Sequence, residues 1–373
     1  MSKFLIYGLS NGIGGVEAIV INMCKVMADT NQFDFLLSDG DCAYKEIFRS
    51  LPSLRRINIT PWGQSRRRFR EDLKHVLLSG NYDYVWFNGC LTSNIDFFEI
   101  TKKYSKAKTI AHSHGSSFEE SNILKRLILL GLHYKNRSSF LELTDIPCMC
   151  SIKSGFWFYG KGFMNKNEVY LIKNGIFANR FKYNSSTRLD YRKKLGFKDS
   201  SKIIFHVGRL TEVKNQKFII DILGESVKID KEVYLVIAGD GPLKDSLIDY
   251  AKSMNLLDKI KFLGSRSDVA ELYQMADVFI LPSFHEGFPV TLVEAQASGL
   301  PCIVSNKVTT EVDVSGDITF LDISAQEASE WADIIMNKIR TTRERSDGFS
   351  KVCERRYSIN DVCDDFLEHL RRI

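Results

Sequence analysis

The sequence lacks the segments that would place the protein in a membrane or outside the cell. In 373 residues, no stretch approaches the roughly 18 consecutive apolar residues that span a bilayer. The apolar run at residues 4–9 is too short for the core of a signal peptide and leads straight into a glycine turn. We therefore expect a chain that is neither exported nor membrane-spanning.

Paired cysteine motifs, strong charge bias and repeats are missing as well. None of the eight cysteines forms a CxxC pair, so nothing signals a zinc ribbon or a thioredoxin-type site, and a reduced cytoplasmic protein fits best. The formal net charge of +5 is too small to predict binding to nucleic acid. The 44% hydrophobic content excludes disorder, and no short-period repeat suggests a solenoid.

What the sequence does contain is an alternation of short apolar runs with helical patterns, in two series. Its length is about two and a half times that of a usual domain. The apolar runs are 3–7, 33–37, 84–87, 108–111, 147–150 and 169–172, then 202–207, 234–238, 260–263, 278–281, 301–304 and 318–321. This pattern predicts an α/β protein with two Rossmann-like, doubly wound domains. The turn at Asn174–Gly175 marks the boundary.

Ligands bind to such sheets at the carboxyl ends of the strands, so two facing domains would form a cleft lined by the loops that follow the strands. One such loop runs from Gly8 to Gly15, and its glycines, Gly14 and Gly15 included, could bring N–H groups close to an anion. It is not the dinucleotide fingerprint, because Glu17 stands where the last glycine belongs. A second glycine loop, 239–242, departs likewise at Lys244. A turn needed only for backbone geometry is the alternative.

Two further loops carry charged residues in informative positions. Beyond Gly208, Arg209 and Lys214 are five residues apart and could converge on one diphosphate, although a solvated basic turn is the alternative. In the segment 282–301, Pro289 suits the first turn of a helix that ends near Gly299.

That helix start predicts an anion site formed by backbone N–H groups at Gly287, Phe288 and Val290. Glu286 would lie at its mouth. Glu294 would lie about 7.5 Å further along the axis, a step comparable with that from a diphosphate to ribose hydroxyls. The alternative for Glu294 is an exposed helix charge.

Two polar pairs raise the possibility of a metal site. His112 and His114 alternate along a strand end, but no third ligand matches them, so a single histidine facing the cleft is favoured. Asp39 and Asp41 flank a glycine after a strand and are interpreted as a turn. No metal or other cofactor is expected.

Together these residues resemble glycosyltransferase family 4, the retaining enzymes of the GT-B fold, and especially members that build capsular and other bacterial surface polysaccharides. The resemblance runs nearly end to end. It rests on Gly14-Gly15-Val16-Glu17, on 111–115, on Cys150-Ser151, on 172–176, on Gly208-Arg209 with Lys214, on 239–242, on 262–264, and on 286–289 with Glu294.

The resemblance implies a role for each matching position. Arg209 and Lys214 match the cations that neutralise the diphosphate of a nucleotide-sugar donor, and Glu294 matches the glutamate that binds the ribose. Glu286 corresponds to the carboxylate beside the transferred sugar. Gly15 corresponds to the glycine near the diphosphate, and His114 to the histidine near the anomeric carbon. The resemblance also implies that residues 358–373 cross back onto the first domain, giving domains of 1–174 plus 358–373 and of 175–357.

The resemblance further implies transfer of a hexose or N-acetylhexosamine, from UDP-sugar in the first instance, to a saccharide or lipid-linked saccharide acceptor. Phe177, where many relatives have Asp, and the absence of a glycine after Ser305 leave the donor sugar open. Two alternatives stand beside this function: a sugar-nucleotide 2-epimerase of the same architecture, and a catalytically silent partner of a true transferase.

A basic segment in the first domain suggests where the protein could meet a membrane. Its cations surround Trp62 and Phe69 and are Arg55, Arg56, Arg66, Arg67, Arg68, Arg70 and Lys74. Such a segment could rest on an anionic leaflet, which predicts peripheral association with the inner face of the plasma membrane. A solvated helix face is the alternative.

Overall fold

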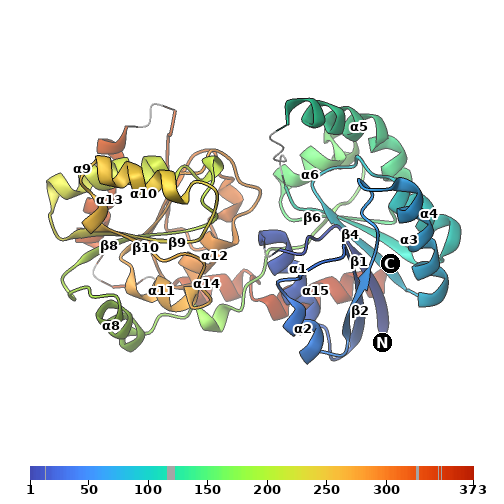
Figure 1. The fold of residues 1–373 in the computed structure, drawn as a ribbon. Coiled ribbons are helices and arrows are strands. Elements are labelled where there is room, and N and C mark those ends of the chain that lie inside the picture. The colour runs from blue at the N-terminus through green and yellow to red at the C-terminus, as the bar shows by residue number, and fades with distance from the viewer. Residues whose placement is uncertain (13, 116–121, 325–326, 343, 346) are drawn as a thin grey trace. The chain divides into compact units, whose positions relative to one another are not determined.

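Two parallel β-sheets, each within its own unit, organise the computed structural model of the protein (Figure 1). The structure describes residues 1–12, 14–115, 122–324, 327–342, 344–345 and 347–373. Unit 1 comprises Met1–Gly175 and Ile359–Ile373, and unit 2 comprises Ile176–Ser358. The sequence analysis drew the corresponding boundary at Asn174–Gly175. Among the described residues, no helix combines the length and the apolar character needed to cross a bilayer.

Unit 1 contains a seven-stranded sheet in the order β3-β2-β1-β4-β5-β6-β7. Its strands are β1 (Ser2–Tyr7), β2 (Asn31–Leu37), β3 (Leu54–Asn58), β4 (Tyr84–Gly89), β5 (Lys108–Ser113), β6 (Ile146–Met149) and β7 (Tyr170–Leu171). Its helices are α1 (Gly15–Val26), α2 (Lys45–Ser50), α3 (Arg66–Gly80), α4 (Asp96–Tyr104), α5 (Ile123–Glu142), α6 (Ile152–Tyr159), α7 (Lys161–Met164) and α15 (Ile359–Arg372).

Alternate residues of the unit 1 strands pack to opposite faces of the sheet. On one face, Phe87 joins an aromatic cluster with Phe97 and Phe98 of α4 and Phe140 of α5. On the other face, Phe366 of α15 packs on Trp86, with ring centroids 5.1 Å apart. The C-terminal helix α15 is therefore part of the unit 1 core.

Unit 2 contains a six-stranded sheet in the order β10-β9-β8-β11-β12-β13. Its strands are β8 (Lys202–Val207), β9 (Val233–Ala238), β10 (Ile260–Phe262), β11 (Val278–Leu281), β12 (Cys302–Ser305) and β13 (Ile318–Leu321). Its helices are α8 (Ser185–Lys194), α9 (Gln216–Ile229), α10 (Lys244–Ser253), α11 (Val269–Met275), α12 (Val290–Ala297), α13 (Ala328–Thr341) and α14 (Gly348–Glu354).

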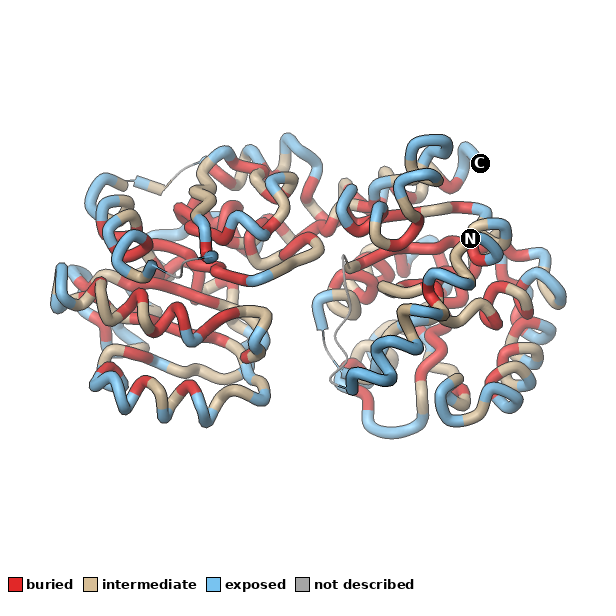
Figure 2. The backbone as a smooth tube through the Cα atoms, turned by 90° about the horizontal axis from the view of Figure 1, so that it is seen from above, coloured by how far each residue is buried: buried red, intermediate tan, exposed pale blue. Residues whose placement is uncertain are grey.

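The unit 2 sheet is covered by helices on both faces. Helices α9, α10 and α13 lie on one face, and α8, α11, α12 and α14 lie on the other (Figure 1). Phe218 of α9 and Trp331 of α13 meet edge to face, with centroids 5.6 Å apart, over buried strand residues such as Ile204. The strands are buried and the outer helix faces are exposed (Figure 2).

These observations confirm the predicted fold class of two doubly wound α/β domains. The sequence analysis missed β3, an edge strand with two arginines among its five residues. In both sheets the strand order reverses beside the first strand, between β1 and β4 in unit 1 and between β8 and β11 in unit 2. Loops diverge at such a switch point and leave a crevice at the carboxyl ends of the strands. Each unit therefore has one place where a ligand is expected.

Candidate active site

The loops after β8 and β11 are joined at the switch point of unit 2. The N–H of Phe284 donates to the carbonyl of Val213 at 2.9 Å. The side-chain amide of Asn215 donates to the carbonyl of Pro282 at 3.3 Å. Asn215 has a φ of 55°, in the left-handed region that asparagine enters more readily than most residues. Two segments that are distant in sequence thus form one surface.

Lys214 and Glu286, one from each loop, form an ion pair on this surface. The Nζ of Lys214 lies 2.6 Å from Oε1 of Glu286, and the two side chains are 20% and 12% exposed. Because the pair is mostly buried, removing either partner would leave the other charge poorly compensated. The structure therefore brings together two residues that the sequence analysis placed at the site.

Arg209 is exposed, and no other described residue pairs with its guanidinium group. Its backbone is fixed by a hydrogen bond, because Nε2 of Gln216 donates to the Arg209 carbonyl at 2.9 Å. Gln216 also lies 3.2 Å from Nε2 of His206, whose Nδ1 lies 3.0 Å from the carbonyl of Ile280. Burial lowers the pKa of His206 to about 4, so the neutral ring donates through Nδ1 and accepts through Nε2. His206 and Gln216 are supports that the sequence analysis did not identify.

The second glycine loop packs directly against the Arg209 loop. A side chain at Gly239, whose φ is +141°, would place its Cβ 1.9 Å from the carbonyl oxygen of Gly208. A Cβ at Gly241 would lie 2.4 Å from the carbonyl oxygen of Leu210. Because both positions are glycine, the backbone of this loop can pack directly on the backbone of the Arg209 loop. That packing fixes the position of the loop that carries Arg209.

Helix α12 begins at Val290, with Pro289 as its N-cap residue. Pro289 thus lies one position before the first turn that the sequence analysis assigned to it. Phe288 is buried and stacks on Tyr357, with centroids 5.7 Å apart and planes 8° apart. The helix start carries a partial positive charge and lies four residues after Glu286. An anion could be bound here by N–H groups beside the Lys214–Glu286 pair.

Glu294 is partly exposed on the second turn of α12, with Oε2 3.1 Å from the hydroxyl of Tyr273. The same hydroxyl lies 2.9 Å from the carbonyl oxygen of Thr291. Burial raises the pKa of Glu294 to about 7, an effect that Tyr273 and Arg180 oppose. Glu294 is therefore not the freely solvated helix charge of the alternative interpretation. Tyr273 was missed because a lone tyrosine in an amphipathic helix indicates only core packing.

In unit 1, the glycine loop after β1 is organised by Glu17. The Glu17 carboxylate accepts from the N–H of Gly14 at 3.1 Å, from the N–H of Ser10 at 2.9 Å and from the hydroxyl of Ser10 at 2.8 Å. The Gly14 N–H, which we expected to approach a bound anion, thus has a partner within the chain. Gly15 is exposed at the start of α1, with open space where a Cβ would lie.

His114 follows β5 and is 8% exposed. Its Nε2 lies 2.9 Å from Oδ1 of Asn88, and burial lowers its pKa to about 3. The ring is therefore neutral near pH 7, with Nε2–H donating to Asn88. The His112 ring centroid lies 3.9 Å from that of His114. Among the described residues, no three His, Cys, Asp or Glu side chains converge as a metal-ligand set.

A cavity of about 240 Å³ lies beside Asn88, at the switch point of unit 1. Tyr7, Asn88, Ser93 and Asn94 supply polar groups to its lining. Gly8 has a φ of +99°, and a Cβ there would lie 1.9 Å from the Asn88 carbonyl oxygen, so only glycine allows this approach. The sequence analysis missed the cavity because its residues form no motif. Asp39 and Asp41 lie outside it in an exposed turn, where Asp41 pairs with Lys45 at 3.0 Å.

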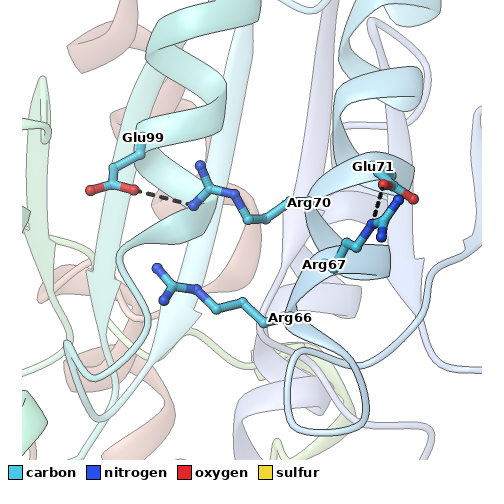
Figure 3. A pocket seen from close by; sticks show the side chains of 5 residues that line it. All are labelled: Arg66, Arg67, Arg70, Glu71 and Glu99. Atoms are coloured by element: carbon cyan, nitrogen blue, oxygen red, sulfur yellow. Dashed lines mark hydrogen bonds and ion pairs between the residues drawn. The ribbon is translucent and has the colours of Figure 1, made fainter.

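Much of the basic segment is paired within the chain, around a hollow of about 800 Å³ (Figure 3). Arg66 contacts both carboxylate oxygens of Asp96, at 2.6 and 2.8 Å. Arg70 also pairs with Asp96 and lies 3.4 Å from Glu99. Two further pairs are Arg67–Glu71 at 3.0 Å and Arg55–Asp34 at 2.8 Å. The segment therefore presents less uncompensated positive charge than its sequence suggests.

Comparisons with known proteins show which sequences this chain is similar to. The family model described as "Glycosyl transferases group 1" matches residues 187–321. EpsF of Bacillus subtilis, a protein described as a glycosyltransferase, is 34% identical over 332 residues, which cover 86% of this chain and 84% of EpsF. A UDP-Gal:α-D-GlcNAc-diphosphoundecaprenol α-1,3-galactosyltransferase of Escherichia coli is 36% identical over 149 residues, covering 39% of this chain and 38% of the enzyme.

The fold is shared with solved structures as well. The crystal structure of HepE from Anabaena in complex with UDP-glucose superposes with a TM-score of 0.78 over 100% of both chains, at 20% sequence identity. At that identity the likeness concerns the fold, which is the GT-B fold that the sequence analysis expected.

Proposed function

The chain belongs to the group 1 glycosyl transferases, and on that premise we propose that it is a retaining, family 4 type enzyme that moves a hexose or N-acetylhexosamine from a nucleotide diphosphate sugar to a saccharide acceptor. A UDP-sugar is the first candidate donor, because HepE was crystallised with UDP-glucose. The observation that carries the proposal is the Lys214–Glu286 pair at the switch point of unit 2, beside the start of α12.

The proposed chemistry follows from the charges that develop during transfer. Breaking the bond between sugar and diphosphate puts positive character on the anomeric carbon and negative charge on the leaving phosphate. Arg209, Lys214 and the N–H groups at the start of α12 would stabilise that phosphate more in the transition state than in the ground state. The leaving phosphate would then help to accept the proton of the acceptor hydroxyl. This scheme needs no metal ion.

The carboxylates and the histidine take separate parts in this scheme. Glu286 would orient Lys214 and contact the transferred sugar, and Glu294 would accept hydrogen bonds from the ribose hydroxyls. Because burial holds the pKa of His114 at about 3, this residue would hydrogen-bond the sugar as a neutral ring and would not protonate it.

We assign the acceptor to the cavity beside Asn88, which lies next to His114 and carries hydroxyl and amide groups suited to a saccharide. A lipid-linked acceptor, met on the inner face of the plasma membrane, is part of the proposal. It is supported by the E. coli relative, whose name specifies a diphosphoundecaprenol acceptor.

Substitution of the two cations tests the proposal. Arg209→Ala and Lys214→Ala should each lower donor turnover by about 10²–10³-fold, since one preorganised donor group contributes roughly that much. Lys228→Ala, which removes an exposed lysine paired with Glu225 on α9, should leave turnover unchanged. Near-normal turnover in both site variants would contradict the proposal. Conversion of the donor alone into a new sugar nucleotide would favour an epimerase.

A further inference from the structure

The first two turns of α5 expose large apolar side chains to solvent. The α5 apolar patch consists of Ile123, Leu124, Leu127 and Ile128, which are 76%, 69%, 61% and 53% exposed. In Figure 2 the start of this helix, next to the grey trace of residues 116–121, is pale blue. Farther along the helix, His133 and Phe140 are buried in unit 1.

The patch is contiguous and is the largest group of exposed apolar side chains on a described helix; α6 exposes two, four positions apart. Ile123 and Leu127 are four positions apart, as are Leu124 and Ile128, so their side chains neighbour one another along the helix. Leu78 on α3 and Leu189 on α8 are similarly exposed, at 57% and 50%, but each is the only such residue on its helix. Single exposed apolar residues need no explanation, whereas a contiguous group marks an interaction surface.

The charge of α5 indicates the kind of partner. Helix α5 contains Lys125, Arg126, Lys135 and Arg137, and its one acidic residue is Glu142 at the last position. Lys125 and Arg126 are exposed beside the patch, and Lys135 is exposed farther along the helix. Apolar side chains flanked by cations suit the headgroup region of an anionic bilayer, where the apolar groups enter the acyl boundary and the cations meet lipid phosphates.

We propose that the α5 apolar patch docks unit 1 onto an anionic lipid bilayer. This moves the membrane contact from the basic segment, where the sequence analysis placed it, to a different helix. On α3 the apolar residues Phe69, Leu73 and Leu77 are buried, and Arg66, Arg67 and Arg70 are paired with carboxylates. That helix exposes a single large apolar side chain, Leu78, whereas the α5 apolar patch has four side by side.

Vesicle cosedimentation of the full chain tests the proposal. The wild type should bind vesicles of mixed phosphatidylcholine and phosphatidylglycerol and should bind pure phosphatidylcholine far less. Leu124→Ser/Leu127→Ser should lower the partition coefficient on the mixed vesicles by about tenfold or more, since two inserted leucines are lost. The matched control Leu78→Ser/Leu189→Ser removes two exposed leucines elsewhere, 57% and 50% exposed, and should stay within about twofold of wild type.

A second pair of measurements separates the proposal from its rivals. Arg67→Ser/Arg68→Ser on α3 should retain most of the binding, and a loss that matches the α5 variant would overturn the assignment to α5.

Light scattering in solution gives the oligomeric state. A wild-type dimer that ignores vesicles and becomes monomeric in Leu124→Ser/Leu127→Ser would show that a second copy covers the patch, and would also overturn the proposal. Circular dichroism should show that all variants fold, because every substituted side chain is exposed.

Discussion

At the scale of single residues, Glu294 connects the proposed function with the pH dependence of stability. Its pKa changes on folding, and its carboxylate is the group proposed to bind the ribose hydroxyls. Burial raises its pKa from 4.5 to about 7. Between those values the folded chain holds a proton that the unfolded chain has released. The free energy of unfolding therefore falls as pH rises through this window, and the loss is complete above the folded pKa.

We predict that Glu294→Gln becomes more stable relative to wild type as pH rises through this window, because glutamine has no charge to bury. The gain should be of the order of 1–3 kcal/mol between about pH 5 and about pH 8. Urea unfolding at the two pH values measures it. Glu330→Gln on the exposed side of α13 serves as the control and should show no such change. An equal difference between Glu294→Gln and wild type at both pH values would contradict the assignment.

The residues that could be predicted from the sequence are those with charge or special backbone geometry in loops after strands. Lys214 and Glu286 were both expected at the site from their loop positions, but the ion pair between them was not predicted. Tyr273, His206 and Gln216 were not predicted, because each supports the site from within a strand or helix. In a sequence, a buried polar residue of this kind cannot be told from one that only completes the core.

At the scale of elements, the Gly208 loop and the Gly239 loop are packed backbone to backbone, with no room for a side chain at Gly239. We predict that Gly239→Ala destabilises unit 2 by about 3 kcal/mol or more, because the residue has a strained φ and its Cβ would overlap the Gly208 carbonyl. Chemical unfolding measures the loss.

Gly63→Ala provides a control for that substitution. Nothing lies within 4 Å of a Cβ at Gly63, so its effect should remain within about 0.5 kcal/mol. If the two alanine variants proved equally stable, the two loops would not be packed as described.

Most elements could be predicted, because buried parallel strands give continuous apolar runs and the helices between them are amphipathic. β3 could not, since an edge strand pairs through its backbone on one side only and tolerates Arg55 and Arg56. The exposed start of α5 could not be predicted either. Its leucines and isoleucines indicate a buried helix until the structure shows that nothing within the described part of unit 1 covers them.

At the scale of the whole molecule, the sequence predicted two Rossmann-like domains because the same alternation of strand and helix occurs twice. It could not show by itself which unit receives the last helix. That placement depends on tertiary contacts, such as Phe366 on Trp86 and the Tyr84 hydroxyl on the Leu370 carbonyl at 3.3 Å. In the proposed function the two units have separate parts: unit 2 would bind the nucleotide diphosphate, and unit 1 would supply His114 and the acceptor cavity.

Calorimetric titration of the full chain with UDP and with UMP tests this division most directly. Wild type should bind UDP at least about tenfold more tightly than UMP, since only UDP offers a second phosphate to Arg209 and Lys214. Arg209→Ala and Lys214→Ala should remove most of that preference, and His114→Ala should leave it intact. Retention of the UDP preference in both cation variants, or its loss in His114→Ala, would contradict the account.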